Sequence, residues 1–592
     1  MSNLRSSYVK KLILVGLSGL LISGCNNDDK NETTQDTAQN SLDQCTSEFL
    51  TKSFDDPNYK VLSTHYFKKG EVLALSENDS TNLQAANNVC VAKVLVGPET
   101  NPQDKDQPSY SEGIGIEVWL PDQENWNKRI HVKGGGGWVG GKHRNTNFLV
   151  GITAGSMGSA ADTATVEGAV SATTDTGHSI TNGSFAMNAD GSINTVLWKD
   201  FAERGIHEMA VVSKKLTRQY YGEDAKFSYW NGFSTGGRQG LKEAQANPQD
   251  FDGILAGAPA INWTRFITSE LYPQVIMQRD LDGNLITAEQ LTRVSNQANE
   301  TCSMINGQAY GYLIDPSNCT YDPTKDTSIL CENNPSESCL SLSQAQAINK
   351  MWYGQTEDGS VPDPVLDNGF NLNLSTKQKW FGLTRGTNLS RLAGTTPFLH
   401  STDLVALISQ DSRLAQENFI NKISNGINAW KTLTYSDLND VQQKGLALQE
   451  QFSNINTDQT DLSEFNREGR KLIIYHGLAD VVIMPQGTLR YISQLNETMG
   501  ESTVSSFMKA YFIPGMGHSF ANGTSNSNAN VALPTNQEMY QALTNWVEKG
   551  IQPSSLTAYS ETKDRSLPIC VYPQKISYIS GNINSVDSYM CS

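Results

Sequence analysis

Ser234 stands in a sequence pattern that is typical of a catalytic nucleophile. Gly232, Ser234 and Gly236 match the motif G-x-S-x-G, in which the serine occupies a sharp turn between a strand and a helix. Residues 227–231 before the motif have the composition of a buried strand, and residues 241–246 after it have a helical pattern. The N-terminus of such a helix presents free N–H groups and a positive dipole end to a developing oxyanion. The pattern therefore predicts that Ser234 attacks a carbonyl group.

A serine hydroxyl is a poor nucleophile at neutral pH, so this prediction requires a base and an acid that orients the base. In hydrolases with this motif, the acid and then the histidine follow the serine along the chain. Asp480 and His518 each lie on a loop directly after a predicted strand. We therefore expect Ser234, Asp480 and His518 to form a catalytic triad. His476 is the competing base, but it precedes the acid and adjoins the strand, which favours a supporting role.

An oxyanion needs two hydrogen-bond donors, and the sequence offers two sources. One is the backbone N–H of Thr235, the residue after the nucleophile. The other is a run of four glycines at residues 134–137, which follows a predicted strand at residues 129–133. We expect Gly135 or Gly136 to supply the second N–H, and a flexible turn is the alternative interpretation of the run.

The elements that must position these residues alternate between strands and helices, which predicts a mostly parallel sheet covered on both faces. The expected fold class is α/β, with an α/β-hydrolase core. Residues 262–460 differ, because they are rich in Asn, Asp, Ser and Thr and hold four cysteines. We interpret them as a large lid domain inserted between two parts of the core, residues 45–261 and 461–592. Strands are predicted at residues 94–96, 115–120, 129–133, 227–231, 253–256, 471–475 and 510–513, and helices at 201–221, 241–246 and 537–548.

The N-terminus has the layout of an export signal. A basic start precedes an apolar run at residues 12–22, which is too short to remain as a membrane-spanning helix. Residues 21–25, Leu-Ile-Ser-Gly-Cys, resemble the lipobox of bacterial lipoproteins, which implies a signal peptide at residues 1–24 and a lipid on the Cys25 thiol. The chain is thus predicted to be an exported bacterial lipoprotein, anchored by this lipid alone. Asn26 favours the outer membrane, and plain secretion with an incidental cysteine is the alternative.

Composition limits what the remaining chain can be. Residues 25–44 are largely Asn, Asp, Thr and Gln, which predicts a flexible tether. The part after the tether is roughly 550 residues, and this size favours two domains or one with a large insertion. No other stretch of about 18 apolar residues is present, so we expect no further membrane span. The net charge is −17 and no basic run stands out, which argues against a nucleic acid partner.

Eight cysteines remain once Cys25 is assigned to the lipid, and an even number in an exported chain predicts four disulfides. Sequence alone allows 105 pairings of eight cysteines. A zinc site is the competing interpretation, but the sequence has no CxxC pair. Pairing of nearest neighbours would join Cys45 with Cys90, Cys302 with Cys319, Cys331 with Cys339, and Cys570 with Cys591.

Several segments carry a recognisable signature: residues 231–240 (Asn-Gly-Phe-Ser-Thr-Gly-Gly-Arg-Gln-Gly), the glycines 134–137, residues 174–178 (Thr-Asp-Thr-Gly-His), 477–480 (Gly-Leu-Ala-Asp) and 514–518 (Pro-Gly-Met-Gly-His). Together they resemble the tannase/feruloyl esterase family, which includes the mono(2-hydroxyethyl) terephthalate hydrolase type. The resemblance implies an α/β-hydrolase core with an inserted lid. It also implies a carboxylic ester hydrolase that needs no cofactor and takes small esters of feruloyl, galloyl or terephthaloyl type.

Two departures from the family pattern matter. Most members carry bonded cysteines just before the nucleophile and just after the histidine, where this chain has Phe233 and Ser519. The family also has a calcium loop in the lid, but here its three carboxylates are replaced by Ser303, Asn306 and Tyr310. Because calcium prefers several carboxylate oxygens, we expect no appreciable metal binding there, with weak binding through neutral oxygens as the alternative.

The acyl pocket is expected to use aromatic residues of the lid. Trp380 and Phe381 are the predicted wall, and ordinary lid core is an equal alternative for both. Arg391 is a candidate partner for a substrate carboxylate, although an exposed ion-pairing arginine is the plainer interpretation. The competing functions are a non-catalytic ligand-binding surface lipoprotein on the same fold, which an intact triad disfavours, and a peptidase.

Overall fold

The computed structural model describes residues 40–592 except for 77–80, 102–103, 105–108, 139 and 154. The predicted signal peptide, Cys25 and most of the predicted tether lie outside the described residues. The prediction that the tether extends to residue 44 is wrong at its end, because residues 40–44 are helical. Ser41 is buried there, and its carbonyl accepts a hydrogen bond from the Tyr220 hydroxyl (3.1 Å).

Five parallel strands form the centre of the molecule. They lie in the order β13-β12-β9-β8-β6, so the carboxyl ends of all five meet at one edge. The predicted strands in this part of the chain were found, and most are one or two residues longer than expected. The strands are β6 (Arg129–Lys133), β8 (Phe227–Phe233), β9 (Gly253–Gly257), β12 (Lys471–Gly477) and β13 (Met508–Ile513).

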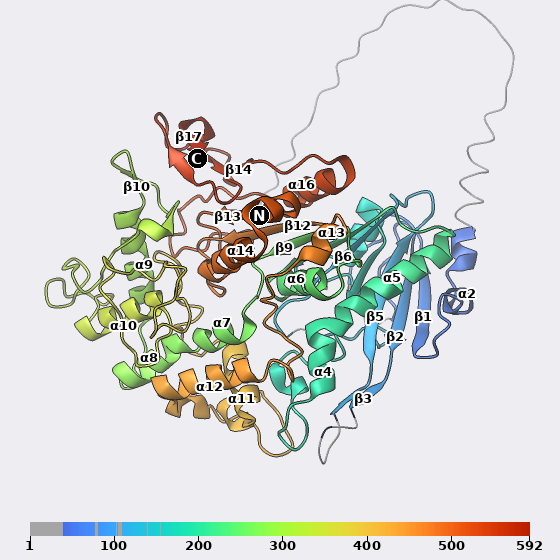
Figure 1. Cartoon of the computed structure of the whole chain (residues 1–592), viewed down its shortest axis with the longest axis horizontal. Helices are drawn as coiled ribbons and strands as arrows, with labels where there is room; N and C mark the ends of the chain where they lie inside the picture. Colours follow the sequence, from blue (N-terminus) through green and yellow to red (C-terminus); the bar gives the residue numbers. More distant parts are fainter. Residues whose placement is uncertain (1–39, 77–80, 102–103, 105–108, 139, 154) are drawn as a thin grey trace, which may run out of the picture.

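The early strands are antiparallel, which the prediction of a mostly parallel sheet did not include. They are β1 (Tyr59–Phe67), β2 (Val89–Val96), β5 (Ile114–Pro121) and β7 (Ser171–Thr174). Two hydrogen bonds join them to β6: the His131 N–H donates to the Val170 carbonyl (2.8 Å), and the Val170 N–H donates to the Arg129 carbonyl (3.0 Å). In Figure 1 the two groups of strands therefore form one twisted layer, with β1 and β2 at the right.

Helices cover both faces of the parallel strands, as predicted. Alternate residues of β12 face opposite ways, because side chains in a strand have a period of two. Leu472 and Ile474 pack in a core with the helices on one face, and Ile473 and Tyr475 pack in a core with the helix on the other. The first face is covered by α5 (Gly205–Tyr221), α6 (Thr235–Ala246) and α14 (Pro485–Met499), and the second by α16 (Asn536–Lys549).

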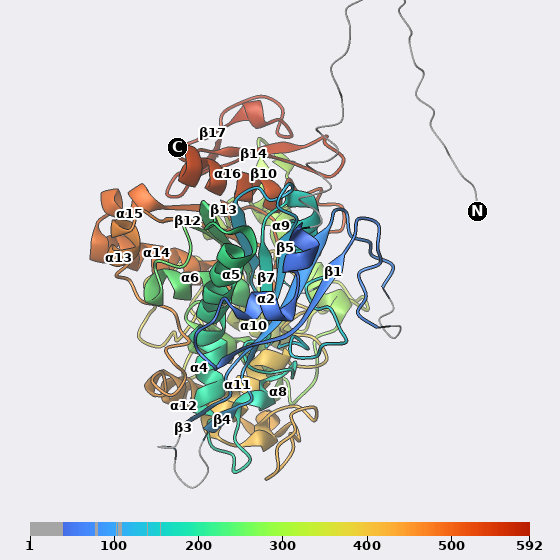
Figure 2. The ribbon, with the colours of Figure 1, turned by 90° about the vertical axis from the view of Figure 1, so that its right-hand side faces the viewer.

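The inserted lid is largely helical and has its own apolar core. Its helices are α7 (Trp263–Glu270), α8 (Tyr272–Asp280), α9 (Ala288–Cys302), α10 (Leu342–Tyr353), α11 (Leu399–Ser409) and α12 (Tyr435–Ala447). Trp138, Trp198 and Phe201 of the hydrolase core pack into the same cluster, so the lid is seated on the core through aromatic contacts. In Figures 1 and 2, α11 and α12 lie at the bottom, away from the C-terminal strands β14 (Leu556–Tyr559) and β17 (Tyr589–Cys591) at the top.

The two ends of the lid are tied together at one residue. The Asn262 N–H donates to the Asn456 carbonyl (2.7 Å), and the Thr264 N–H donates to Asn456 Oδ1 (2.9 Å). Ile455 belongs to the core of the lid and Leu462 to the core beneath the sheet. The change from the core of the lid to the core beneath the sheet therefore falls between residues 455 and 462.

Four disulfides join Cys45 to Cys90, Cys302 to Cys319, Cys331 to Cys339 and Cys570 to Cys591, which is the nearest-neighbour arrangement. Two of them close loops within the lid. Among the residues that the structure describes, no helix combines the length and the apolar character needed to span a bilayer.

Candidate active site

Ser234 lies at the turn between β8 and α6 in a backbone conformation that non-glycine residues rarely adopt. Its φ is 62° and its ψ is −122°. The flanking glycines are required by close contacts: a Cβ on Gly232 would lie 2.5 Å from the Gly236 carbonyl oxygen, and one on Gly236 would lie 2.7 Å from Ser156 Oγ. The motif spacing therefore follows from the space inside the turn.

Three predicted residues meet at the carboxyl edge of the sheet. His518 Nε2 lies 2.9 Å from Ser234 Oγ, and His518 Nδ1 lies 2.8 Å from Asp480 Oδ2. The loop after β8 supplies the serine, the loop after β12 supplies the aspartate, and the loop after β13 supplies the histidine. This chain of contacts is the geometry that lets a histidine take a proton from a serine while a carboxylate holds the imidazole.

Asp480 is fully buried, and its four hydrogen-bonding partners favour its ionised form. Its Oδ1 accepts the N–H groups of Val482 (2.8 Å) and Ile483 (2.9 Å). His476 Nε2 lies 3.2 Å from Asp480 Oδ2, which gives this histidine the supporting position expected from the sequence. Burial acts to raise the pKa of Asp480, but the charge of His518 and the hydrogen bonds from both histidines hold it well below its usual range.

Aromatic packing supports the His518 loop at Phe233, one of the two positions where the sequence was expected to depart from the family pattern. The Phe233 ring meets the His518 ring edge to face, with their centroids 5.0 Å apart. Tyr475 contacts Phe233 (5.9 Å) and stacks on Phe520 (5.2 Å). The histidine loop is therefore held from β8 and β12 by side-chain contacts, without a covalent bond.

Two residues in the Ser234 cavity lining are candidates to bind an oxyanion through their backbone N–H groups, Thr235 and Gly136. Thr235 is the first residue of α6, where the helix itself provides no acceptor. Of the two predicted glycines, Gly135 donates its N–H to Gln239 Oε1 (3.0 Å), which leaves Gly136 as the candidate. Gly137, which was not predicted, also lines the site, and its carbonyl accepts the Thr235 hydroxyl (3.1 Å).

A cavity of about 270 Å³ opens beside Ser234. The hydrolase core contributes Gly136, Gly137, Phe233, Val482 and Ile483 to its lining. The lid contributes side chains from α7 and from the start of α11: Trp263, Phe266, Ile267, Glu270, Phe398 and His400. The walls are therefore mostly apolar or aromatic, and Ser234 and His518 are part of the same lining.

The lid residues chosen from the sequence lie elsewhere. Trp380 and Phe381 are buried in the lid core, in contact with each other (5.1 Å), and neither lines the cavity, so the alternative interpretation describes them better. Arg391 places its guanidinium over the ring of Phe398 (4.8 Å), at the outer side of a cavity wall. The residues of α7 were missed, although the position of this helix directly after β9, at the edge that carries Ser234, could have identified them.

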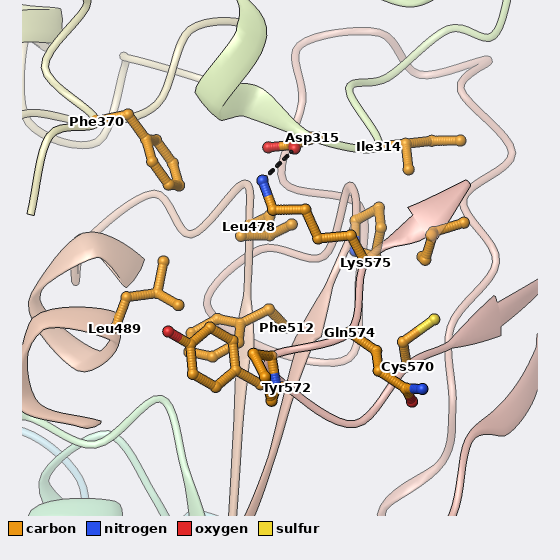
Figure 3. Close-up of a pocket in the computed structure, with 13 residues that line it drawn as sticks. Ile314, Asp315, Phe370, Leu478, Leu489, Phe512, Cys570, Tyr572, Gln574 and Lys575 are labelled. Atoms are coloured by element: carbon orange, nitrogen blue, oxygen red, sulfur yellow. Dashed lines mark hydrogen bonds and ion pairs between the residues drawn. The ribbon is translucent and has the colours of Figure 1, made fainter. Parts of the chain in front are cut away.

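A second cavity, of about 100 Å³, lies between the lid and the C-terminal segment (Figure 3). Phe370, Leu478 and Tyr572 line it, and an ion pair between Lys575 Nζ and Asp315 (2.9 Å) crosses its mouth. No residue of the triad contributes to this cavity. This second cavity is therefore a gap between domains and is separate from the triad.

The loop that replaces the family's calcium loop is a β-hairpin. Asn306 and Gly307 both have positive φ (48° and 76°), as the two-residue turn between β10 (Met304–Ile305) and β11 (Gln308–Ala309) requires. Ser303 Oγ accepts the Gly311 N–H (3.1 Å). The Tyr310 ring lies beneath the Arg565 guanidinium (4.2 Å). Elsewhere in the described chain, His207, Glu243 and Asp250 have ligand atoms within 4.8 Å of one another, but they do not line the Ser234 cavity.

Comparison with known proteins identifies the family to which the chain belongs. Residues 92–592 match the family described as tannase and feruloyl esterase. A probable feruloyl esterase of Arthroderma benhamiae is 30% identical over 490 residues, which cover 81% of this chain and 82% of that protein. A probable feruloyl esterase B-2 of Aspergillus terreus is 27% identical over 555 residues, covering 90% and 93%.

Two solved structures share the fold. Feruloyl esterase B from Aspergillus oryzae aligns with a TM-score of 0.69 at 23% identity, covering 93% of this chain and 100% of that chain. Tannin acyl hydrolase from Aspergillus niger aligns with a TM-score of 0.69 at 20% identity, covering 93% and 95%. The architecture is thus that of an α/β-hydrolase with an additional domain.

Proposed function

Because this chain belongs to the tannase and feruloyl esterase family and is a carboxylic ester hydrolase, we propose that it cleaves esters of aromatic acids through an acyl-enzyme on Ser234. The observation that carries the proposal is the continuous contact from Ser234 through His518 to Asp480. The apolar cavity beside Ser234 supports the aromatic substrate class, because a flat ring buries well against Phe266, Phe398 and their neighbours.

The first half of the proposed reaction forms the acyl-enzyme. His518 Nε2 takes the Ser234 proton while Oγ bonds to the ester carbonyl carbon. The negative charge that develops on the carbonyl oxygen is stabilised by the N–H of Thr235 and one N–H of the glycine run. The intermediate then expels the alcohol, which receives the proton from His518.

The second half releases the acid. A water molecule gives a proton to His518 and attacks the acyl carbon, and the bond to Ser234 Oγ breaks as the proton returns to the serine. Asp480 keeps its charge throughout. Its role is to hold the imidazole in one orientation and to stabilise the imidazolium.

We also propose export as a lipoprotein anchored through Cys25. Four disulfides support an oxidising compartment, since thiols in a reducing cytosol stay unpaired. Radiolabelled fatty acid incorporated into the full chain, and lost in Cys25→Ser, is the expected result. Equal labelling of the variant would reject the anchor.

The proposed hydrolysis is tested on the full chain with methyl ferulate, methyl gallate, the terephthalate mono-ester of ethylene glycol and p-nitrophenyl acetate. Ser234→Ala should abolish turnover of every ester that the wild type accepts. Ser519→Ala is the matched control, because this exposed serine adjoins His518 and has no part in the mechanism; it should keep wild-type activity. Turnover of none of the aromatic esters, or an active Ser234→Ala, would overturn the proposal.

A further inference from the structure

One carboxyl group in the Ser234 cavity has no partner in the protein. Glu270, the last residue of α7, lines the cavity with a side chain that is 0% exposed. Neither carboxyl oxygen has a hydrogen-bond partner among the described residues. Leaving a buried polar group unpaired is costly, so such a group in a binding cavity points to a ligand that completes it.

Two further polar atoms in the same lining are unpaired within the described structure: Trp263 Nε1 and His400 Nδ1. His400 Nε2 accepts the Trp138 N–H (3.1 Å). In a neutral imidazole the other nitrogen then carries the proton, so His400 Nδ1 is a donor. Burial lowers the pKa of His400 to about 4, with Arg391 and His518 acting in the same direction, so the ring is neutral at pH 7.

The surroundings of Glu270 favour its neutral form. Burial and the negative charge of Asp480 raise the pKa of Glu270 well above its usual value, against the opposing charge of Arg391. A protonated carboxyl group offers one O–H donor and one carbonyl acceptor. With Glu270 in its favoured neutral form, the unpaired polar groups are all uncharged, and two of them, Trp263 Nε1 and His400 Nδ1, can only donate.

The surfaces between these groups are apolar. Phe266, Ile267, Phe398 and Ile483 provide them. A ring that is flat, apolar on its faces and polar at an edge position matches this lining. A phenol meets the requirement, because its hydroxyl can donate to the Glu270 carbonyl and accept from the Glu270 O–H or from another of the donors.

We propose that Glu270 is a specificity residue that binds a hydroxyl group on the aromatic ring of the acyl part of the substrate. This inference rests on the proposed ester hydrolysis and narrows its substrate class to hydroxylated aromatic acids. A ring without a hydroxyl leaves the Glu270 carboxyl group unpaired. A terephthaloyl ring places its own carboxylate, which is charged at neutral pH, next to the Glu270 carboxyl group.

The test compares methyl 4-hydroxycinnamate with methyl cinnamate, which differ only in the ring hydroxyl. Wild type should prefer the hydroxylated ester by about tenfold or more in kcat/KM, because one good hydrogen bond in a dry site is worth that much. Glu270→Leu should lower kcat/KM for the hydroxylated ester and keep or raise it for the cinnamate, so that the ratio approaches one. Glu270→Gln, which keeps a donor and an acceptor, should retain part of the preference.

Asp403→Asn is the control for a buried acid of the lid. Asp403 lies in α11, is buried, and accepts the Gly183 N–H (2.9 Å) outside the cavity lining. This variant should leave the ratio unchanged.

p-Nitrophenyl acetate separates the two possible failures. An unchanged ratio in Glu270→Leu and Glu270→Gln, with p-nitrophenyl acetate still cleaved, overturns the role of Glu270 and leaves the esterase proposal intact. Cleavage of p-nitrophenyl acetate by wild type without cleavage of either cinnamate, methyl ferulate, methyl gallate or the terephthalate mono-ester overturns both proposals.

Discussion

Each side of the Ser234 cavity contains one buried carboxyl group, and the two groups have opposite surroundings. On the core side, Asp480 accepts two backbone N–H groups and contacts two histidines. On the lid side, Glu270 is equally buried and has no partner among the described residues. The pKa of Asp480 is held below its usual range and that of Glu270 is raised above it.

The difference shows which interactions the chain completes by itself. A charge that must be present before substrate arrives is surrounded by fixed donors, so no reorganisation is needed during the reaction. A group that recognises substrate must keep its hydrogen-bonding capacity free, and it does so at the expense of stability in the unliganded protein. The contrast is what the two proposals require, with the reaction carried by the core side and recognition of the aromatic ring by the lid side.

Asp480→Asn breaks the core side and should have the largest effect. An amide keeps the shape but reverses one hydrogen bond and removes the charge beside His518, so kcat should fall by about 10³–10⁴-fold. Steady-state rates with p-nitrophenyl acetate measure the change. A folded variant with more than a tenth of wild-type activity would show that His518 does not depend on this carboxylate.

Gly137→Ala disturbs the junction of the two sides. Gly137 has a φ of 55°, and a Cβ there would lie 2.3 Å from His400 Nε2, whereas a Cβ on Gly136 would meet nothing within 4 Å. Relieving this contact would shift the adjoining Gly136 N–H, the oxyanion candidate; displacing such a donor typically costs about 10²-fold in kcat, and we expect that order for Gly137→Ala. Gly136→Ala is the comparison variant: it keeps this N–H and its Cβ meets none of the described residues, so we expect a much smaller loss in kcat. Equal losses of kcat in both variants would mean that any side chain added to the glycine loop misplaces the oxyanion donor, whether or not it contacts His400.

Phe233→Leu weakens the support of the histidine loop. The variant keeps an apolar side chain but loses the edge-to-face contact with His518, which is worth about 1 kcal/mol. We expect kcat to fall by up to about tenfold with little change in KM, measured on methyl ferulate. Unchanged kcat would show that the loop is held by other contacts, such as that between Tyr475 and Phe520.

Glu270→Gln should change how stability depends on pH. Because the folded pKa of Glu270 is raised, the folded state holds a proton that the unfolded state has already lost, and wild type therefore loses stability as pH rises above the ordinary glutamate pKa. The variant lacks this loss, so its free energy of unfolding relative to wild type should rise between pH 5 and pH 8, by at most about 1.4 kcal/mol per pH unit. Urea unfolding at the two pH values measures it. A constant difference would mean that Glu270 does not titrate in this way.

Much of the sheet and the order of the three triad residues could be predicted from sequence because both depend on local signals. Buried strands are short apolar runs, and each functional residue follows one of them along the chain. The helix after Ser234 was placed too late, at residue 241, because Gly236, Gly237 and Gly240 lower helix propensity. Tertiary packing requires these glycines: a Cβ on Gly240 would lie 2.5 Å from the Trp230 ring.

The lid side could not be predicted with the same success, because nothing local distinguishes a cavity wall from a core. Trp380 and Phe381 are aromatic, as is the true lining, but they pack inside the lid. Glu270 is a charged residue type, for which exposure is the ordinary expectation. Its burial depends on the way that α7 folds back over the carboxyl edge of the sheet, which only the tertiary structure provides.

The central claim, that Ser234 carries the acyl group, is tested most directly by covalent labelling. A fluorophosphonate bonds to the hydroxyl of an activated serine with loss of fluoride. The account predicts that one label per chain abolishes ester hydrolysis, that peptide mapping places it on Ser234, and that methyl ferulate slows its attachment. Full hydrolytic activity in the labelled protein, or a label mapped to another serine while Ser234 stays free, would contradict it.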